Sequence, residues 1–185
     1  AREGGALYLQ GVNAKIDGFT STSSHALVDG GAIYIRQGGD NANISRANIT
    51  GSSAANSGGA IYIYGNNAYI SDSFITDSEA KASSGFISNN FGGAVYIRGT
   101  DAKVGATIVD ARAYDGGAIY IRQGGDNAII FNSNISDCTV TDKGGAIYIH
   151  GVHASVINSS VANSSAKSLS GYNNNNIGGA VYIIS

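Results

Sequence analysis

One short motif, Gly-Gly-Ala followed by an aliphatic residue, tyrosine and a second aliphatic residue, recurs seven times in this chain of 185 residues. Its copies begin at Gly4, Gly30, Gly58, Gly92, Gly116, Gly144 and Gly178. The intervals are 26, 28 and 34 residues and then 24, 28 and 34 residues, so a block of three units is itself duplicated. Residues 30–42 and 116–128 are identical. Repeats of this period indicate a fold in which each unit buries its apolar face against its neighbours.

Each unit has the pattern of short β-strands. The motif alternates and is rich in β-branched and aromatic residues, which is typical of a strand. A turn such as residues 37–41 follows, and then aliphatic residues recur two and seven positions after an alanine, as at Ile44 and Ile49 after Ala42. Three short strands in a unit of about 29 residues predict an all-β chain, a parallel β-helix (β-solenoid) of about seven coils. A β-propeller needs blades of roughly 40 residues, and a leucine-rich repeat needs more than the four leucines present.

The repeat predicts a single β-helix domain over residues 1–185. Its two super-repeats span about 4–91 and 92–177, and the first strand of a seventh coil spans 178–185. The chain contains no methionine, so we expect a processed product or a piece of a longer protein. Neither end has a recognisable cap, so we expect either the ordered part of a longer repeat protein or subunits that stack end to end.

The motif at Gly30-Gly31-Ala32-Ile33 and its six copies resembles the GGA[ILV]/FxxN repeat of chlamydial polymorphic outer-membrane proteins. The FxxN half fits at residues 86–89 and 131–134. The chain resembles still more closely the β-helical adhesin-like surface proteins of methanogenic archaea. The resemblance covers essentially the whole chain, and it implies a β-helix that acts at a cell surface.

The alternation of the motif also predicts which side chains face outward. The two aliphatic residues share one face of the strand, whereas the tyrosine shares the other with the residue after the motif, which is often arginine. Because an unpaired arginine is costly in an aliphatic core, the tyrosine face should lie outside. It predicts an exposed ladder that could bind another subunit or glycan rings, formed by Tyr8, Tyr34, Tyr62, Tyr96, Tyr120, Tyr148 and Tyr182. The alternative is that the stacked rings only stabilise the sheet.

Composition excludes several classes of function. The net charge is −2 and charged residues make up only 13%, so we expect no nucleic-acid partner. No apolar run approaches the roughly 18 residues of a membrane span, so we expect no membrane insertion.

The candidate acids for polysaccharide cleavage are Asp29, Asp40, Asp72, Asp77, Glu79, Asp115 and Asp126. The copies at Asp40 and Asp126, or at Asp29 and Asp115, lie three coils apart, about 14 Å, which is too far for paired catalytic carboxylates.

The remaining polar signals are weak. His25, His150 and His153 are too few and too scattered to predict a metal site, and no cofactor motif is present. Cys138 should be a small buried hydrophobic residue.

The long loops at 83–91 and 168–177 leave the coil at equivalent positions and are either binding loops or tolerated insertions. Five Asn-X-Ser/Thr sequons permit glycosylation without indicating it: Asn43, Asn48, Asn134, Asn158 and Asn163.

These features predict a non-enzymatic, extracellular or cell-surface β-solenoid with a structural or adhesive role. The expected partner is a second copy of the chain, associated end to end or laterally into a fibre or sheath, and surface glycans are a further candidate. We expect no cofactor and no metal. The alternative function is a polysaccharide-binding or polysaccharide-cleaving β-helix.

Overall fold

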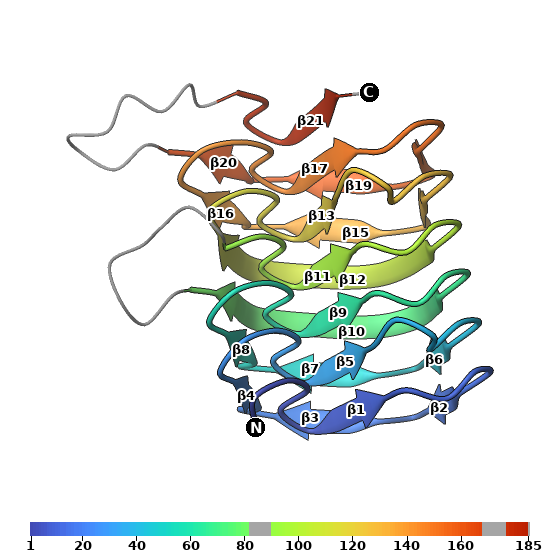
Figure 1. The fold of residues 1–185 in the computed structure, drawn as a ribbon. Coiled ribbons are helices and arrows are strands. Elements are labelled where there is room, and N and C mark those ends of the chain that lie inside the picture. Colours follow the sequence, from blue (N-terminus) through green and yellow to red (C-terminus); the bar gives the residue numbers. More distant parts are fainter. Residues whose placement is uncertain (82–89, 168–176, 185) are drawn as a thin grey trace.

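The computed structural model describes residues 1–81, 90–167 and 177–184, and within these ranges the chain forms strands and turns and no helix. Figure 1 shows the strands stacked along one axis, with the N-terminus at one end of the stack and the C-terminus at the other. The described strands make six turns of a solenoid, and strand β21 begins a seventh. The predicted parallel β-solenoid is therefore confirmed.

The first sheet is built from the aliphatic-Tyr-aliphatic part of the motif. Among the described residues it has seven parallel strands: β1 (Leu7–Leu9), β5 (Ile33–Ile35), β9 (Ile61–Ile63), β11 (Val95–Ile97), β13 (Ile119–Ile121), β17 (Ile147–His150) and β21 (Val181–Ile184). Neighbouring strands pair residue for residue, so tyrosine lies against tyrosine from Tyr8 to Tyr182.

The second sheet forms the rest of each coil. Its described strands are β2 (Lys15–Asp17), β3 (Thr20–Thr22), β4 (His25–Ala26), β6 (Asn43–Ser45), β7 (Asn48–Thr50), β8 (Ser53–Ala54), β10 (Tyr69–Ala80), β12 (Lys103–Ala113), β14 (Ile129–Phe131), β15 (Asn134–Ser136), β16 (Thr139–Val140), β18 (Ser155–Ile157), β19 (Ser160–Ala162) and β20 (Ser165–Ala166). A coil such as the second thus has three three-residue strands and a shorter one of two residues. In the third and fourth coils, β10 and β12 run through these segments without a break.

Two corners separate the segments of the second sheet. At these corners one residue adopts a positive φ, as at Arg46 and Gly51 in the second coil and Asp72 and Asp77 in the third, except at the first corner of the fourth coil. This conformation suits glycine, asparagine and aspartate, which fill most of these corners. Each corner reverses the alternation of side chains, so the following segment can again direct an aliphatic residue into the interior.

The core lies between the two sheets and runs the length of the stack. Its largest fully buried side chains are isoleucines, with Ile33, Ile35, Ile61 and Ile63 from the first sheet facing residues such as Ile44 from the second. Cys138 is also fully buried in this cluster, as predicted, and burial raises the pKa of its thiol to about 11. Stacking of identical positions thus converts a repeated sequence into continuous apolar columns.

The glycine pair of the motif has two separate structural roles. The first glycine of each pair has a positive φ, as at Gly58 (62°), which an L-residue with a side chain rarely adopts. Except at Gly179 in the last motif, a Cβ on the second glycine would come too close to backbone atoms of the same coil and of the next one. At Gly59 these atoms are the carbonyl groups of Glu79 and Gly93. The pair therefore closes each coil where the end of the second sheet meets the start of the first.

Candidate functional site

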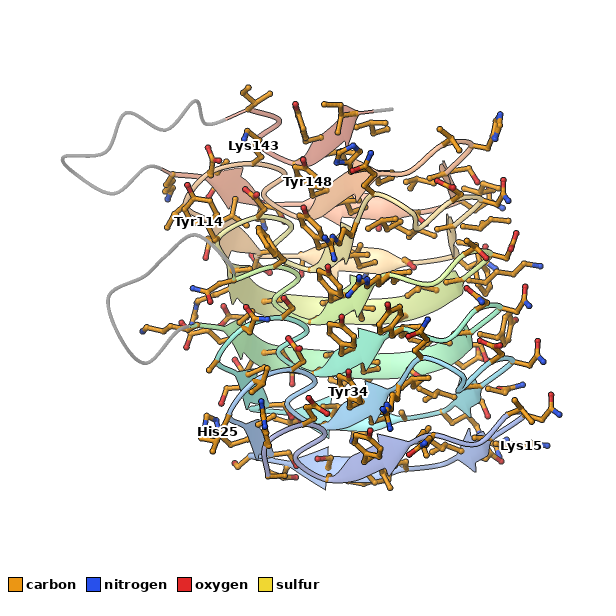
Figure 2. All side chains as sticks on the ribbon, viewed as in Figure 1. Lys15, His25, Tyr34, Tyr114, Lys143 and Tyr148 are labelled. Carbon is orange, nitrogen blue, oxygen red and sulfur yellow. The ribbon has the colours of Figure 1, made fainter. Side chains whose placement is uncertain are left out.

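The seven motif tyrosines form a stacked column on the outer side of the first sheet. Figure 2 shows Tyr34 and Tyr148 in this column, near its two ends. Ring centroids of successive tyrosines lie 4.5–5.4 Å apart, and all but the Tyr148–Tyr182 pair are close to parallel. The tyrosines form a cluster of their own, separate from the isoleucine core. The predicted separation of aliphatic and tyrosine faces is therefore correct.

The predicted exposure of this ladder is wrong for its five central members. Tyr34, Tyr62, Tyr96, Tyr120 and Tyr148 are only 4–9% exposed, whereas Tyr8 at the end is 43% exposed. Stacking hides both faces of each central ring. Arginines of the next coil also lie beside the outer edges, because Arg98 and Arg122 line the same cleft as Tyr62 and Tyr96.

Burial raises the pKa of the hydroxyl groups of the five central tyrosines. Desolvation raises the pKa of Tyr34 to about 12 and raises that of Tyr62 and Tyr120 further. A cleft of about 340 Å³ remains beside the ladder, where Asp29 and Arg122 flank the Tyr62 and Tyr96 rings. What was predicted as an open apolar strip is thus a mostly covered ladder with a polar border.

The duplicated aspartates hold successive coils together. The carboxylate of Asp29 accepts hydrogen bonds from the Asn56 side chain (2.9 Å) and the Ser57 amide (3.0 Å) of the next coil. Its copy Asp115 accepts a bond of 2.8 Å from the Lys143 amide. In the turns, Asp40 accepts from the Asn66 amide, and its copy Asp126 from the Val152 amide. Each of these four candidate acids therefore has a structural role, and the roles of Asp29 and Asp40 recur three coils later at Asp115 and Asp126.

Asp115 is the one of these carboxylates that is almost fully buried, and it should make stability depend on pH. Desolvation is the main cause that raises its pKa to about 6. The folded state thus binds this proton more tightly than the unfolded state, so stability should fall as the pH rises from about 4 to about 6. Asp115→Asn keeps an oxygen for the Lys143 amide, and we expect it to raise the free energy of unfolding at pH 7 by roughly 2 kcal/mol. Urea unfolding at pH 7 and pH 4 measures the effect, and equal stability of the two proteins at both pH values would contradict it.

The other candidate acids lie at corners or on the surface. Asp72 and Asp77 occupy the two positive-φ corners of β10, and Glu79 pairs with Lys81 at 3.6 Å on the exposed side. His25 hydrogen-bonds Ser53 of the next coil at 2.9 Å, while His150 ends β17 and His153 occupies a positive-φ turn. Within residues 1–81, 90–167 and 177–184, no group of three or more side chains is arranged to hold a metal ion.

The sequons lie on the second sheet and its corners. Asn48, Asn134, Asn158 and Asn163 are exposed, and Asn43 is partly buried. The predicted long loops at 83–91 and 168–177 fall almost entirely outside the described residues, as does the FxxN match at 86–89. The described part of the chain contains no helix that is long and apolar enough to cross a bilayer.

The second sheet has a notch that the repeat pattern did not predict. Between the paired positions Ile70–Val104 and Ser73–Ala106, β10 has two residues whereas β12 has only Gly105. The fourth coil is therefore one residue short at its first corner, and a depression of about 270 Å³ lies there. Three aromatic side chains, Tyr69, Phe74 and Phe131, lie in or beside it. The only sequence signal is the 24-residue interval that begins at Gly92, the shortest of the six.

The fold defines a repeat protein of the parallel β-solenoid class. Residues 128–150 match the family model described as the Chlamydia polymorphic membrane protein (Chlamydia_PMP) repeat. This segment contains both the FxxN match at 131–134 and the motif at Gly144, so the resemblance to the chlamydial repeat is confirmed there. The match suggests a surface, adhesin-like β-helix. Neither the curated proteins nor the solved structures give a match. A closer similarity to the methanogen proteins stays a prediction.

Proposed function

We propose that this chain is a non-enzymatic, structural and adhesive β-solenoid of a cell surface. The observation that carries the proposal is the unbroken register of the first sheet, from Tyr8 to Tyr182, over a continuous core. Such a stack is a stiff rod, since each coil is hydrogen-bonded to the coils above and below it. The repeat match at residues 128–150 supports a surface location, and the structural roles of Asp29, Asp40, Asp115 and Asp126 support a chain without a catalytic pair.

Two measurements test this function directly. Antibodies against the chain should label intact, unpermeabilised cells that produce it, and labelling only after permeabilisation would contradict a surface role. Incubation of the chain with a panel of polysaccharides should release no reducing sugar. Release above that of a heat-denatured sample would favour the alternative, a polysaccharide-cleaving β-helix.

The proposed partner is a second copy of the chain, bound end to end. Strands β1 and β21 are the two edges of the first sheet, and both carry the same aliphatic-Tyr-aliphatic pattern as every paired strand between them. Ile183 is 61% exposed and Tyr8 is 43% exposed, so apolar groups lie open at both edges. An uncovered strand edge of this kind recruits further strands. Pairing of β21 with β1 of another copy would continue the tyrosine ladder.

We expect this association to be weak and concentration-dependent. The described first sheet has seven strand rows and the second has six, so a copy seated on β21 would leave the second sheet one row short. Contact would then rely on the first sheet alone. The covered tyrosines leave little apolar area for the lateral association that an exposed strip would have supported.

Ile183→Lys should weaken the self-association at least tenfold, because a lysine at the edge opposes strand pairing. Val12→Lys is the matched control, since Val12 is equally exposed (62%) but lies in a turn. Sedimentation velocity over a range of concentrations measures the effect, and circular dichroism verifies that both variants are folded. A wild-type chain that stays monomeric at the highest concentration would contradict end-to-end association.

A further inference from the structure

The notch at Gly105 is produced by one missing residue in an otherwise regular stack. The third and fifth coils bulge outward at Asp72 and Asn132, which both have a positive φ (50° and 45°). The fourth coil has no such residue between Asp101 and Asp110, and its strand β12 continues past this position without an outward bulge. Its surface therefore lies below that of its neighbours, and the two bulges stand about 10 Å apart, twice the spacing of adjacent strands.

Aromatic side chains form the apolar part of the notch. A Cβ at position 105 would lie 2.8–2.9 Å from ring atoms of Phe131, so glycine allows this ring to rest on the backbone of the fourth coil. From there Phe131 reaches across to Tyr69 of the third coil, with ring centroids 5.7 Å apart. Tyr69 and Phe74 are 37% and 45% exposed. Large aromatic groups are thus held in fixed positions at the surface around one small depression.

The rim of the notch is polar and carries two side chains that are available for hydrogen bonds. Asp72 and Asn132 are exposed on opposite sides of the notch, and neither side chain bonds to another residue in the described parts of the chain. Two other aspartates at or beside corners of the second sheet do have partners. Asp17 is bonded to Ser45 and Arg46, and Asp110 is paired with Arg112. A carboxylate only accepts hydrogen bonds whereas an amide both donates and accepts, so together they suit a ligand with several hydroxyl groups.

We infer that the notch binds a single pyranose ring of a glycan. The C–H face of such a ring is apolar and packs on an exposed aromatic ring such as that of Phe74, while its hydroxyl groups can reach Asp72 and Asn132. A depression of about 270 Å³ is just below the size range of drug-sized ligand pockets and suits one ring.

Other ligands fit the notch less well. A peptide strand would need an unpaired backbone edge, but β12 is already paired with β10 on one side and with β14 and β15 on the other. A divalent cation would need more acidic ligands than Asp72 supplies among the residues that line the notch.

This inference deepens the proposed adhesive role by naming a ligand class, and its failure can be told apart from failure of that role. Surface labelling tests the location of the chain, whereas sugar binding tests the notch alone. If antibodies label the chain on the cell surface but no sugar binds to it, only the inference drawn from the notch is overturned.

The test is a titration of the ¹⁵N-labelled chain with methyl β-glucoside, methyl β-galactoside and the methyl glycoside of N-acetylglucosamine. We expect at least one of them to shift the backbone amide signals of residues 72–74, 105–107 and 131–132 with millimolar affinity, as befits a ligand of about 13–16 non-hydrogen atoms. The double variant Asp72→Gly and Phe74→Asn should weaken this binding at least tenfold. Both replacements occur naturally at the same place in other coils, as Gly18 and as Asn48, so the variant should fold.

Asp77→Gly is the matched control. It makes the same change at the other positive-φ corner of β10, where Gly51 stands in the second coil. This variant should bind the sugar like the wild type. Unchanged amide signals with all three glycosides at up to about 50 mM would overturn the inference. So would equal binding by the double variant, or shifts of the same amides by an N-acetylated tripeptide amide but by no glycoside.

Discussion

Gly59→Ala is expected to prevent the chain from reaching a stable folded state. The added methyl group would overlap the carbonyl oxygen of Gly93 in the next coil and lie 2.6 Å from the carbonyl group of Glu79. These are backbone atoms of paired segments on two sides, so no flexible side chain can move away. A clash that can be relieved only by separating coils should cost more than about 4 kcal/mol, which is a large part of the stability of a typical domain.

Gly179→Ala is the matched control for this change. Gly179 is the second glycine of the last motif, and a Cβ there meets nothing within 4 Å among the described residues. Thermal unfolding followed by circular dichroism should show a cooperative transition for Gly179→Ala close to that of the wild type. If Gly59→Ala melts within a few degrees of Gly179→Ala, close packing of the glycine pair does not hold the coils together.

Ile97→Ala should destabilise the middle of the stack by about 2–5 kcal/mol, because it leaves a cavity among fully buried side chains. Ile183 belongs to the same column, two pairings beyond Ile121, but it is 61% exposed at the edge strand β21. Ile183→Ala should therefore change stability by no more than about 0.5 kcal/mol.

Urea unfolding of the two variants measures this difference, and hydrogen exchange shows where the loss falls. In a stack with nearest-neighbour contacts, Ile97→Ala should speed exchange most in β9, β11 and β13. Similar unfolding midpoints for the two variants would contradict the prediction, because the buried Ile97 would then stabilise the fold no more than the exposed Ile183.

The sequence was sufficient to predict the stacking and the two faces of the first strand. The period of the glycine motif implies the solenoid, and the alternation around Tyr62 places its neighbours Ile61 and Ile63 in the core. The same alternation could not predict that Tyr62 is covered, because alternation gives the side of a sheet and not what lies over it. That cover comes from the stacked rings of Tyr34 and Tyr96 and from Arg98 of the next coil, whose positions follow only from the register.

The roles of the polar residues were harder to predict for the same reason. Asp29 and Asp115 read as surface acids in the sequence, but their hydrogen bonds go to amides 28 residues further along. The notch was hard to predict for another reason. The short interval after Gly92 reveals that residues are missing but not where, and only the pairing of Ile70 with Val104 and of Ser73 with Ala106 places one gap at Gly105.

The parallel ladders also determine how the molecule responds to tension. Hydrogen bonds between coils run along the axis that joins the two ends of the chain, so a pull on both ends would open one row at a time instead of shearing many together. A coil of 28 residues such as 30–57 adds about 4.8 Å to the stack but can extend to roughly 95 Å once it is peeled off. Between two anchored points the chain would unspool gradually and absorb mechanical work before any covalent bond is strained.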